Sequence, residues 1–178
     1  GVIDLPCPAS PLTEAVHAMA DTLITPVNDS FLDVDLLATV DPETFAVSGI
    51  GRYAEKIKDA RLQRLTVGKA ETDWVILRNR LSALSTSRNT RRIGTALAEL
   101  SARLPLRIVD GLAERVIFRE FYTRGLTAMD DMDELTLGSR PTMSHVTARL
   151  EVQALVGAVL LGAQLSTGTE HDPSRAVA

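Results

Sequence analysis

Short apolar runs along the chain alternate with longer segments in which apolar residues recur at helical spacing. The runs are typical of strands that are buried on both faces of a parallel sheet. The clearest is Trp74–Leu77, which lies between polar residues on both sides. Pro26 is expected to end one of the other runs. The predicted strands are residues 2–4, 22–25, 74–77 and 106–111.

Apolar residues at helical spacing predict the elements between these strands. A helix is expected at 10–20, with Ser10 or Thr13 as its cap, because such side chains accept hydrogen bonds from free backbone N–H groups. A helix is expected after Ser30, where Phe31, Leu32, Leu36 and Leu37 recur near helical spacing, and the segment rich in Pro and Gly at 41–51 is interpreted as a loop. The other predicted helices are 52–66, 88–104 and 142–161, and residues 112–125 form a further segment that ends at Gly125. Strands that alternate with helices predict an α/β fold, a parallel sheet with helices on both faces.

Polar residues follow three of the predicted strands. Asp4 closes the first run, Asn28 lies in the segment after the second, and Asn79 comes directly after the Trp74 strand. Ligands of open α/β sheets bind at the carboxyl ends of the strands. We therefore expect Asp4, Asn28 and Asn79 to share one edge of the sheet.

Composition and cysteine usage are typical of a cytoplasmic protein. The longest apolar stretch, 154–163, is interrupted by glycine and is shorter than the roughly 20 residues that a membrane span needs. The single Cys7 has no partner for an internal disulfide. The three histidines, His17, His145 and His171, are far apart and lack neighbouring ligands at zinc spacing.

Charge is distributed unevenly along the chain. Residues 1–50 contain eight acidic residues and no Lys or Arg, whereas residues 51–124 contain sixteen basic and eight acidic residues. Residues 125–178 contain three basic and seven acidic residues, for a net charge of −4 overall. The basic middle segment could attract a polyanion, or its charges could be balanced by acidic residues that lie close in space.

The start of the predicted helix at 88–104 concentrates this positive charge. Arg88, Arg91 and Arg92 stand at positions i, i+3 and i+4, which share a helix face. Guanidinium groups without interleaved aromatic residues suit phosphate oxygens, so we expect sequence-independent, salt-sensitive DNA binding. The alternative is that these arginines pair with Glu99 or other surface acids.

Other basic residues are weaker candidates for DNA contact. Arg78 and Arg80 lie closer to the expected polar edge. Arg119 and Glu120 are expected to form an ion pair that organises the edge of the core, with DNA contact only second.

Asp4 has the position of a Walker B aspartate, an acid at the end of an apolar strand that approaches Mg²⁺. An ordinary strand-end aspartate is the alternative. A phosphate-binding loop of the form G-x-x-x-x-G-K-[ST] is not found in the sequence. The one Gly-Lys pair, Gly68-Lys69, is followed by Ala70, and Gln63 stands where the first glycine is required.

Several segments together resemble the ParA/MinD superfamily of deviant-Walker ATPases, and within it the MipZ family, which positions the division plane. The most specific are TPVNDSFLDVDLL, DWVILRNRL and RVIFREFYTRGLT, within a resemblance that covers roughly residues 2–162. The resemblance implies that Asp4 approaches Mg²⁺ through water, and that Pro6 and Asn79 contact the nucleotide, Asn79 at adenine. Cys7 stands where the family usually has a glycine.

The resemblance also leads to expectations about the whole protein. Residues 1–165 would be the carboxyl-terminal portion of the ATPase domain, with the phosphate-binding loop upstream, and residues 166–178 a polar, disordered tail. ATP and Mg²⁺ are the implied cofactors of the intact protein. The implied partners are a second copy of the chain in the presence of ATP, non-specific DNA on the nucleoid, a ParB-type protein and FtsZ, whose assembly is inhibited. No membrane partner is implied.

Two other classes stay open at this point. One is a DNA-binding regulatory module without nucleotide hydrolysis. The other is an unrelated α/β enzyme with Asp4 or Asp29 as a general base, although no nucleophile elbow is visible in the sequence.

Overall fold

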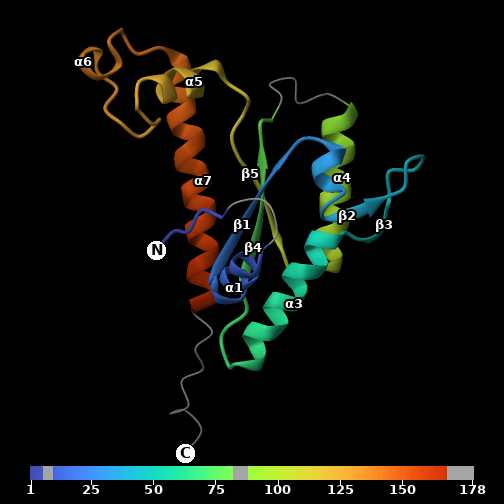
Figure 1. The fold of residues 1–178 in the computed structure, drawn as a ribbon. Coiled ribbons are helices and arrows are strands. Elements are labelled where there is room, and N and C mark those ends of the chain that lie inside the picture. The colour runs from blue at the N-terminus through green and yellow to red at the C-terminus, as the bar shows by residue number, and fades with distance from the viewer. Residues whose placement is uncertain (6–9, 82–87, 168–178) are drawn as a thin grey trace, which may run out of the picture.

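Three of the predicted apolar runs form one parallel sheet, as the computed structural model shows (Figure 1). The structure describes the backbone of residues 1–5, 10–81 and 88–167, and the side chains of these residues except Asn89 and 161–167. The strands are β1 (Thr22–Asn28), β4 (Asp73–Asn79) and β5 (Arg107–Asp110), in the order β1-β4-β5. Trp74, Val75 and Ile76 of the central strand β4 are almost completely buried. The predicted α/β fold with a parallel sheet is confirmed.

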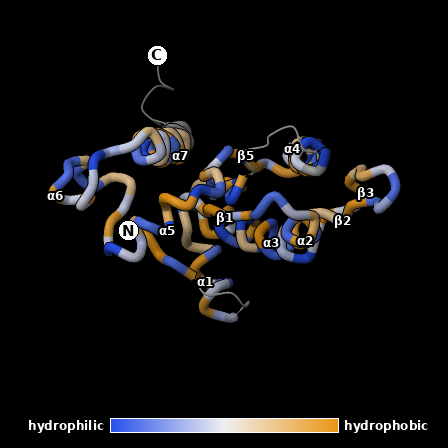
Figure 2. Tube along the Cα trace, turned by 90° about the horizontal axis from the view of Figure 1, so that it is seen from above, coloured by the Kyte–Doolittle hydropathy of each residue, from blue (hydrophilic) through white to orange (hydrophobic). Residues whose placement is uncertain are grey.

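Helices lie on both sides of this sheet. Figures 1 and 2 place α7 on one side and α3 and α4 on the other. The helices are α1 (Pro11–Met19), α2 (Phe31–Val34), α3 (Arg52–Thr66), α4 (Arg88–Arg103), α5 (Val116–Thr123), α6 (Glu134–Leu137) and α7 (Met143–Thr167). In the described residues, no helix combines the length and the apolar character needed to cross a membrane.

Apolar side chains fill two separate cores. The larger core packs Trp74 and Ile76 of β4 against Ile57 of α3 and Leu97 and Leu100 of α4. The smaller core lies between α5, α6 and α7, where the buried residues are Ile117, Phe121, Ala128, Leu137 and Ala148. The larger core fixes α4 against the sheet, and thereby the position of its first turn.

The prediction that Pro26 ends a strand is wrong, because β1 continues through it to Asn28. Pro26 lies opposite Leu77 of β4 in the register. Proline lacks a backbone N–H, so it cannot donate to the hydrogen bonds between strands. It is tolerated in an edge strand, where one side of the strand is unpaired. In this sheet β1 is an edge strand, which explains why the proline is accommodated.

The predicted strand at residues 2–4 is not observed either. Residues 1–5 have no regular secondary structure, and Val2 and Ile3 are strongly exposed. An apolar pair forms a strand only when a neighbouring strand pairs with its backbone. In the described part of the chain, no strand pairs with this segment.

The segment interpreted as a loop contains a β-hairpin. Strands β2 (Ala38–Val40) and β3 (Val47–Ile50) pair antiparallel and form a sheet of their own. Asp41 builds the turn between them, because its Oδ1 accepts hydrogen bonds from the backbone N–H groups of Glu43 (3.0 Å) and Thr44 (2.7 Å). Figures 1 and 2 show the hairpin at the outer side of α2 and α4, away from α7.

The helix predictions are confirmed in part. The bounds of α3 are as expected, and Ser10 caps α1 by accepting from the N–H of Thr13 at 3.2 Å. Helix α2 is only one turn long, α6 was not expected, and α7 extends as far as Thr167, beyond the expected domain boundary at 165. Most of the predicted tail, residues 168–178, lies outside the described residues.

Candidate functional site

Arg78 connects the carboxyl ends of all three parallel strands. From the end of β4, its Nη2 lies 2.7 Å from Oδ1 of Asp29, which follows β1, and its Nη1 lies 3.3 Å from Oδ1 of Asp110, the last residue of β5. Nη2 also donates to the carbonyl of Thr90 in the first turn of α4 at 3.5 Å. The side chains of Arg78 and Asp29 are 14% and 8% exposed. This buried ion pair fixes the edge of the sheet relative to the start of α4.

Asn28 and Asn79 lie side by side at this edge, as expected, because they are the last register pair of β1 and β4. The backbone N and the Nδ2 of Asn28 both donate to Oδ2 of Asp33, at 2.8 and 2.9 Å. The side-chain amide of Asn79 forms no hydrogen bond with the described residues, and Asn79 is half-buried. A free carboxamide can donate to and accept from a purine edge at the same time.

The other nucleotide-site candidates are not brought to this edge by a strand. Asp4 is exposed and lies outside any strand, so the expected strand-end position is not observed. Pro6 and Cys7 lie outside the described residues. Within the described ranges, no group of three His, Cys, Asp or Glu residues could hold a metal ion. An exposed carboxylate such as that of Asp4 fits hydrated Mg²⁺ as a single ligand, since this ion needs only one or two carboxylates besides phosphate and water.

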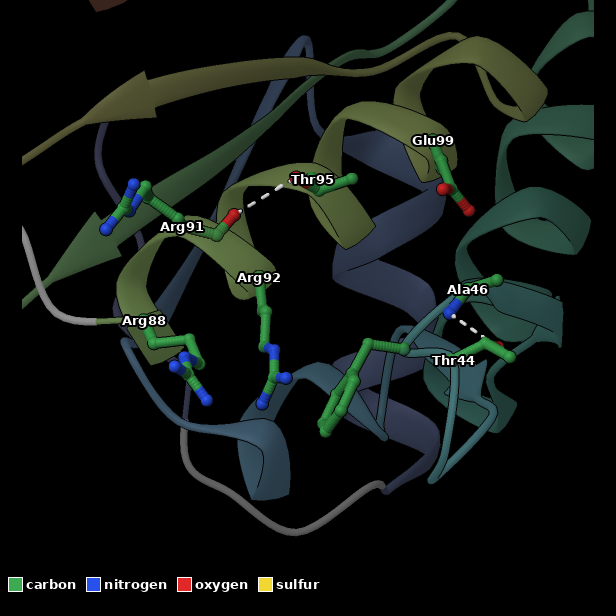
Figure 3. A pocket seen from close by; sticks show the side chains of 8 residues that line it. Thr44, Ala46, Arg88, Arg91, Arg92, Thr95 and Glu99 are labelled. Atoms are coloured by element: carbon green, nitrogen blue, oxygen red, sulfur yellow. Dashed lines mark hydrogen bonds between the residues drawn. The ribbon is translucent and has the colours of Figure 1, made fainter.

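The three predicted DNA-binding arginines lie in the first two turns of α4 and line one cavity of about 380 Å³. In Figure 3, Arg88 and Arg92 extend to the same side, toward the β2–β3 hairpin, whereas Arg91 points away from it. The cavity is completed by Thr95 and Glu99 of α4 and by Thr44, Phe45 and Ala46 of the hairpin loop. We call this surface the arginine cavity.

Arg92 stacks on an aromatic ring that the sequence did not reveal as part of the site. Its guanidinium carbon lies 3.9 Å from the centroid of the Phe45 ring. Phe45 has a φ of 61°, in the left-handed region that bulky residues rarely adopt. The ring of Phe31 packs against it, with 5.3 Å between the centroids. The Asp-Pro-Glu-Thr turn before Phe45 is the signal by which the hairpin could have been found.

The alternative interpretation paired these arginines with Glu99 or other surface acids, but the Glu99 carboxylate is bound elsewhere. Its Oε2 accepts a hydrogen bond from the backbone N–H of Val47 at 2.9 Å. Nη2 of Arg103 donates to the backbone carbonyl of Val47 at 2.6 Å. Within the part of the chain that the structure describes, neither Arg88 nor Arg92 forms an ion pair. Pairing with Glu99 therefore does not account for these two arginines.

The helix itself adds positive potential at the arginine cavity. The backbone dipoles of a helix give its N-terminus about half a positive charge, which favours anions and disfavours cations. The first turn of α4 contains no acidic residue. Arginines at this end weaken the helix, so their placement is better explained by attraction of an external anion than by stability.

A second cavity of about 580 Å³ is also lined by Phe45 and is partly acidic. Asp35 and Asp41 line it together with the apolar side chains of Phe31 and Leu32. Hydrogen bonds from Thr44 and the backbone of Glu43 hold the pKa of Asp41 below its usual range. Phe45 is the residue that the two cavities share.

The remaining basic candidates are paired. Arg80 and Arg119 both lie beside Oε1 of Glu114, at 2.8 and 3.1 Å, and the bond from Arg80 is the main cause of the lowered pKa of Glu114. The expected Arg119–Glu120 pair is wrong, because adjacent helix residues do not face each other.

A parallel sheet with helices on both faces and polar side chains at its carboxyl edge is the architecture of P-loop nucleotide hydrolases. The family comparison gives a narrower assignment. The model of the MipZ family, described as ATPase MipZ, matches residues 1–163. The chain therefore belongs to the MipZ family of ATPases, a relative of the ParA/MinD proteins, as its segments predicted. A comparison with curated proteins found no match.

Proposed function

We propose that this protein is a MipZ-type ATPase whose ATP-bound homodimer binds DNA without sequence preference through the arginine cavity. Bound to the nucleoid in the cytoplasm, it positions the division plane by interacting with a ParB-type protein and by inhibiting FtsZ assembly. Membership in the MipZ family supports the division role and the use of ATP with Mg²⁺. In this proposal, residues 1–165 are the carboxyl-terminal portion of its ATPase domain.

One observation carries the DNA-binding part of the proposal. Arg88 and Arg92 point into the same cavity, and neither has a carboxylate partner among the described residues. Unpaired guanidinium groups beside a helix N-terminus attract phosphate oxygens strongly. No aromatic side chain besides Phe45 lines the described part of the cavity, and Phe45 is covered by Arg92. Base stacking is therefore not part of the proposed contact.

For the nucleotide, we retain the roles that the family resemblance implies. Asn79 supports this assignment because its amide is free at the carboxyl edge of β4, where nucleotides bind in such sheets. Asp4 would contribute one carboxylate toward Mg²⁺, and Pro6 would contact the nucleotide. Since the 178 residues contain no G-x-x-x-x-G-K-[ST] motif, we propose that other residues of the intact protein bind the phosphates.

A DNA-binding regulatory module without nucleotide hydrolysis is the second candidate, and the free arginines support it equally well. Mg²⁺-dependent ATP turnover by the full-length protein distinguishes the two. An enzyme with Asp29 as general base has no support, because Arg78 already occupies that buried carboxylate.

The DNA contact is tested by fluorescence anisotropy of a labelled duplex with full-length protein, ATP and Mg²⁺, between 50 and 200 mM salt. Three phosphate contacts per protomer, six in the ATP-bound dimer, give a slope of log K against log salt of about −5.4, which is about an 1,800-fold loss of affinity over this range. Each of Arg88→Ala, Arg91→Ala and Arg92→Ala removes one contact from each of the two cavities and should make the slope shallower by about 1.8.

Arg140→Ala is the matched control, because Arg140 is 90% exposed and lies outside the cavity. It removes the same charge and should leave both affinity and slope close to wild type. Two duplexes of unrelated sequence should bind equally. Unchanged affinity and slope in all three cavity variants would refute the proposed DNA contact.

A further inference from the structure

We infer that Phe45 is a positioning residue for DNA binding, which holds the Arg92 guanidinium ready for a phosphodiester oxygen. This inference rests on the proposed function, since it concerns the same cavity. It adds a residue from the β2–β3 hairpin, and this residue itself carries no charge. The hairpin thereby becomes part of the DNA-binding surface.

The stacking geometry leaves the hydrogen-bonding groups of Arg92 available. A guanidinium is planar, and its five N–H groups point outward in that plane. When the plane lies over an aromatic face, the ring attracts the charge without using any of these donors. At 3.9 Å from the ring centroid, the Arg92 carbon is in such a contact. The N–H groups stay free for the two oxygens of a phosphate.

The backbone of the hairpin loop fixes Phe45 in turn. Its N–H donates to the carbonyl of Asp41 at 2.9 Å, and the N–H of Asp41 donates to the carbonyl of Ala46 at 2.9 Å. The carboxylate of Asp41 accepts from both the N–H and the hydroxyl of Thr44. These bonds hold the loop in the conformation that gives Phe45 its left-handed φ of 61°. The φ angle directs the ring toward α4.

Further contacts join the hairpin to the helix that carries Arg92. Val47, two residues after Phe45, bonds through its N–H to Glu99 and through its carbonyl to Arg103 of α4. Phe31 supports the Phe45 ring from the side of α2. Ring and guanidinium therefore belong to one rigid unit. An arginine that is already held loses less side-chain freedom when it binds, and this strengthens binding.

The test is a double-mutant cycle measured by the same DNA anisotropy titration of the full-length protein with ATP and Mg²⁺. Phe45→Leu removes the aromatic face and keeps an apolar side chain, and Phe45→Tyr retains the face. Phe45→Leu should weaken DNA binding about twofold to fivefold for each cavity of the dimer, the effect of one exposed cation–π contact, and Phe45→Tyr should bind like wild type. In the Arg92→Ala background, Phe45→Leu should have no further effect.

Two results would overturn the inference without affecting the proposed function. One is an equal loss of affinity on Phe45→Leu with and without Arg92, which would mean that Phe45 acts only on folding. The other is that Phe45→Leu binds DNA as tightly as wild type, whereas Arg92→Ala binds DNA more weakly than wild type. If instead Arg88→Ala and Arg92→Ala bind DNA like wild type, the proposed DNA contact itself fails.

Circular dichroism checks that the variants fold, and Phe45→Met takes the place of Phe45→Leu if Phe45→Leu does not fold.

NMR of the Arg92 side chain gives an independent result in the absence of DNA. A ring-current shift of its protons should be present in wild type and Phe45→Tyr and lost in the aliphatic variant. Identical Arg92 shifts in all three proteins would contradict the stacked arrangement.

Discussion

Charge reversal at the first residue of α4 should stabilise the protein while it weakens DNA binding. Arg88 is exposed, and within the described residues it has no ion-pair partner. It stands at the positive end of a 16-residue helix, where a cation is unfavourable. In Arg88→Glu, the unfavourable charge is replaced by one that the helix N-terminus favours.

The magnitude follows from local terms. Removing a cation from the helix N-terminus and adding an anion each contributes about 0.3–1 kcal/mol at low salt. The carboxylate introduced by Arg88→Glu would also lie three and four residues before Arg91 and Arg92, at about 0.2–0.5 kcal/mol for each pair. Screening and exposure reduce the total, so we expect a gain of about 1 kcal/mol. For a chain of this length, the melting temperature should rise by about 2–4 °C.

Thermal melts of wild type, Arg88→Gln and Arg88→Glu at low salt measure the effect, and the neutral variant should lie between the other two. At 1 M salt, where the screening length falls to about 3 Å, the differences should disappear. DNA affinity should fall in the same order as stability rises. A lower melting temperature for Arg88→Glu at low salt would refute this reasoning, because it would mean that Arg88 stabilises the native fold.

Three further predictions concern the edge of the sheet, α1 and the nucleotide. Arg78→Gln should reduce the free energy of unfolding by about 3 kcal/mol in urea titrations, because it leaves the buried Asp29 carboxylate without its partner; a loss below about 1 kcal/mol would contradict this. The pKa of His17 is lowered from 6.5 in the native protein, mainly by burial. As the pH falls, His17 is therefore protonated in the unfolded chain before it is protonated in the native protein. The free energy of unfolding should decrease as the pH drops from 6.5 toward the lower native pKa. His17→Gln should lose less stability than wild type between pH 7.5 and 5.5, and an equal loss would exclude His17 as the cause. The 178 residues alone should show no Mg²⁺-dependent ATP turnover in a phosphate-release assay, and measurable turnover would show that the chain binds the phosphates by another route.

Local signals predicted the parallel sheet and most of its helices. The continuous apolar run of β4 indicated a strand covered on both faces, and Trp74, Val75 and Ile76 are indeed almost fully buried. The polar cap before α1 also gave its start, because capping depends only on Ser10 and its immediate neighbours. The shared edge of Asn28 and Asn79 followed from the rule that parallel strands align their carboxyl ends.

Features that depend on distant residues were missed. Whether Pro26 interrupts β1 depends on the strand order, and only an edge strand tolerates it. The strands of the β2–β3 hairpin are too short to show a clear alternation, so their pairing and the turn at Asp41 were not recognised. The contact of Arg92 with Phe45 requires the hairpin to lie against α4, which no local pattern encodes.

The same limit applies to charge. Counting the basic residues of 51–124 identified a positive segment but not which residues are free. Arg78, Arg80 and Arg119 are paired with carboxylates, whereas Arg88 and Arg92 are not, within the described residues. Partner geometry, which is set by the tertiary fold, decides which arginines can meet an external anion.

The most direct test of the account is whether nucleotide controls DNA binding at the arginine cavity. DNA affinity of the full-length protein is measured with ATP and with ADP, for wild type, the Arg88→Ala/Arg92→Ala double variant and Arg140→Ala. For wild type and Arg140→Ala, we predict that DNA binds more tightly with ATP than with ADP. The slope of log K against log salt should also be about twice as steep with ATP, because the dimer presents two cavities. The double variant should show neither difference. Equal affinity and slope with both nucleotides, and in all three proteins, would contradict the account.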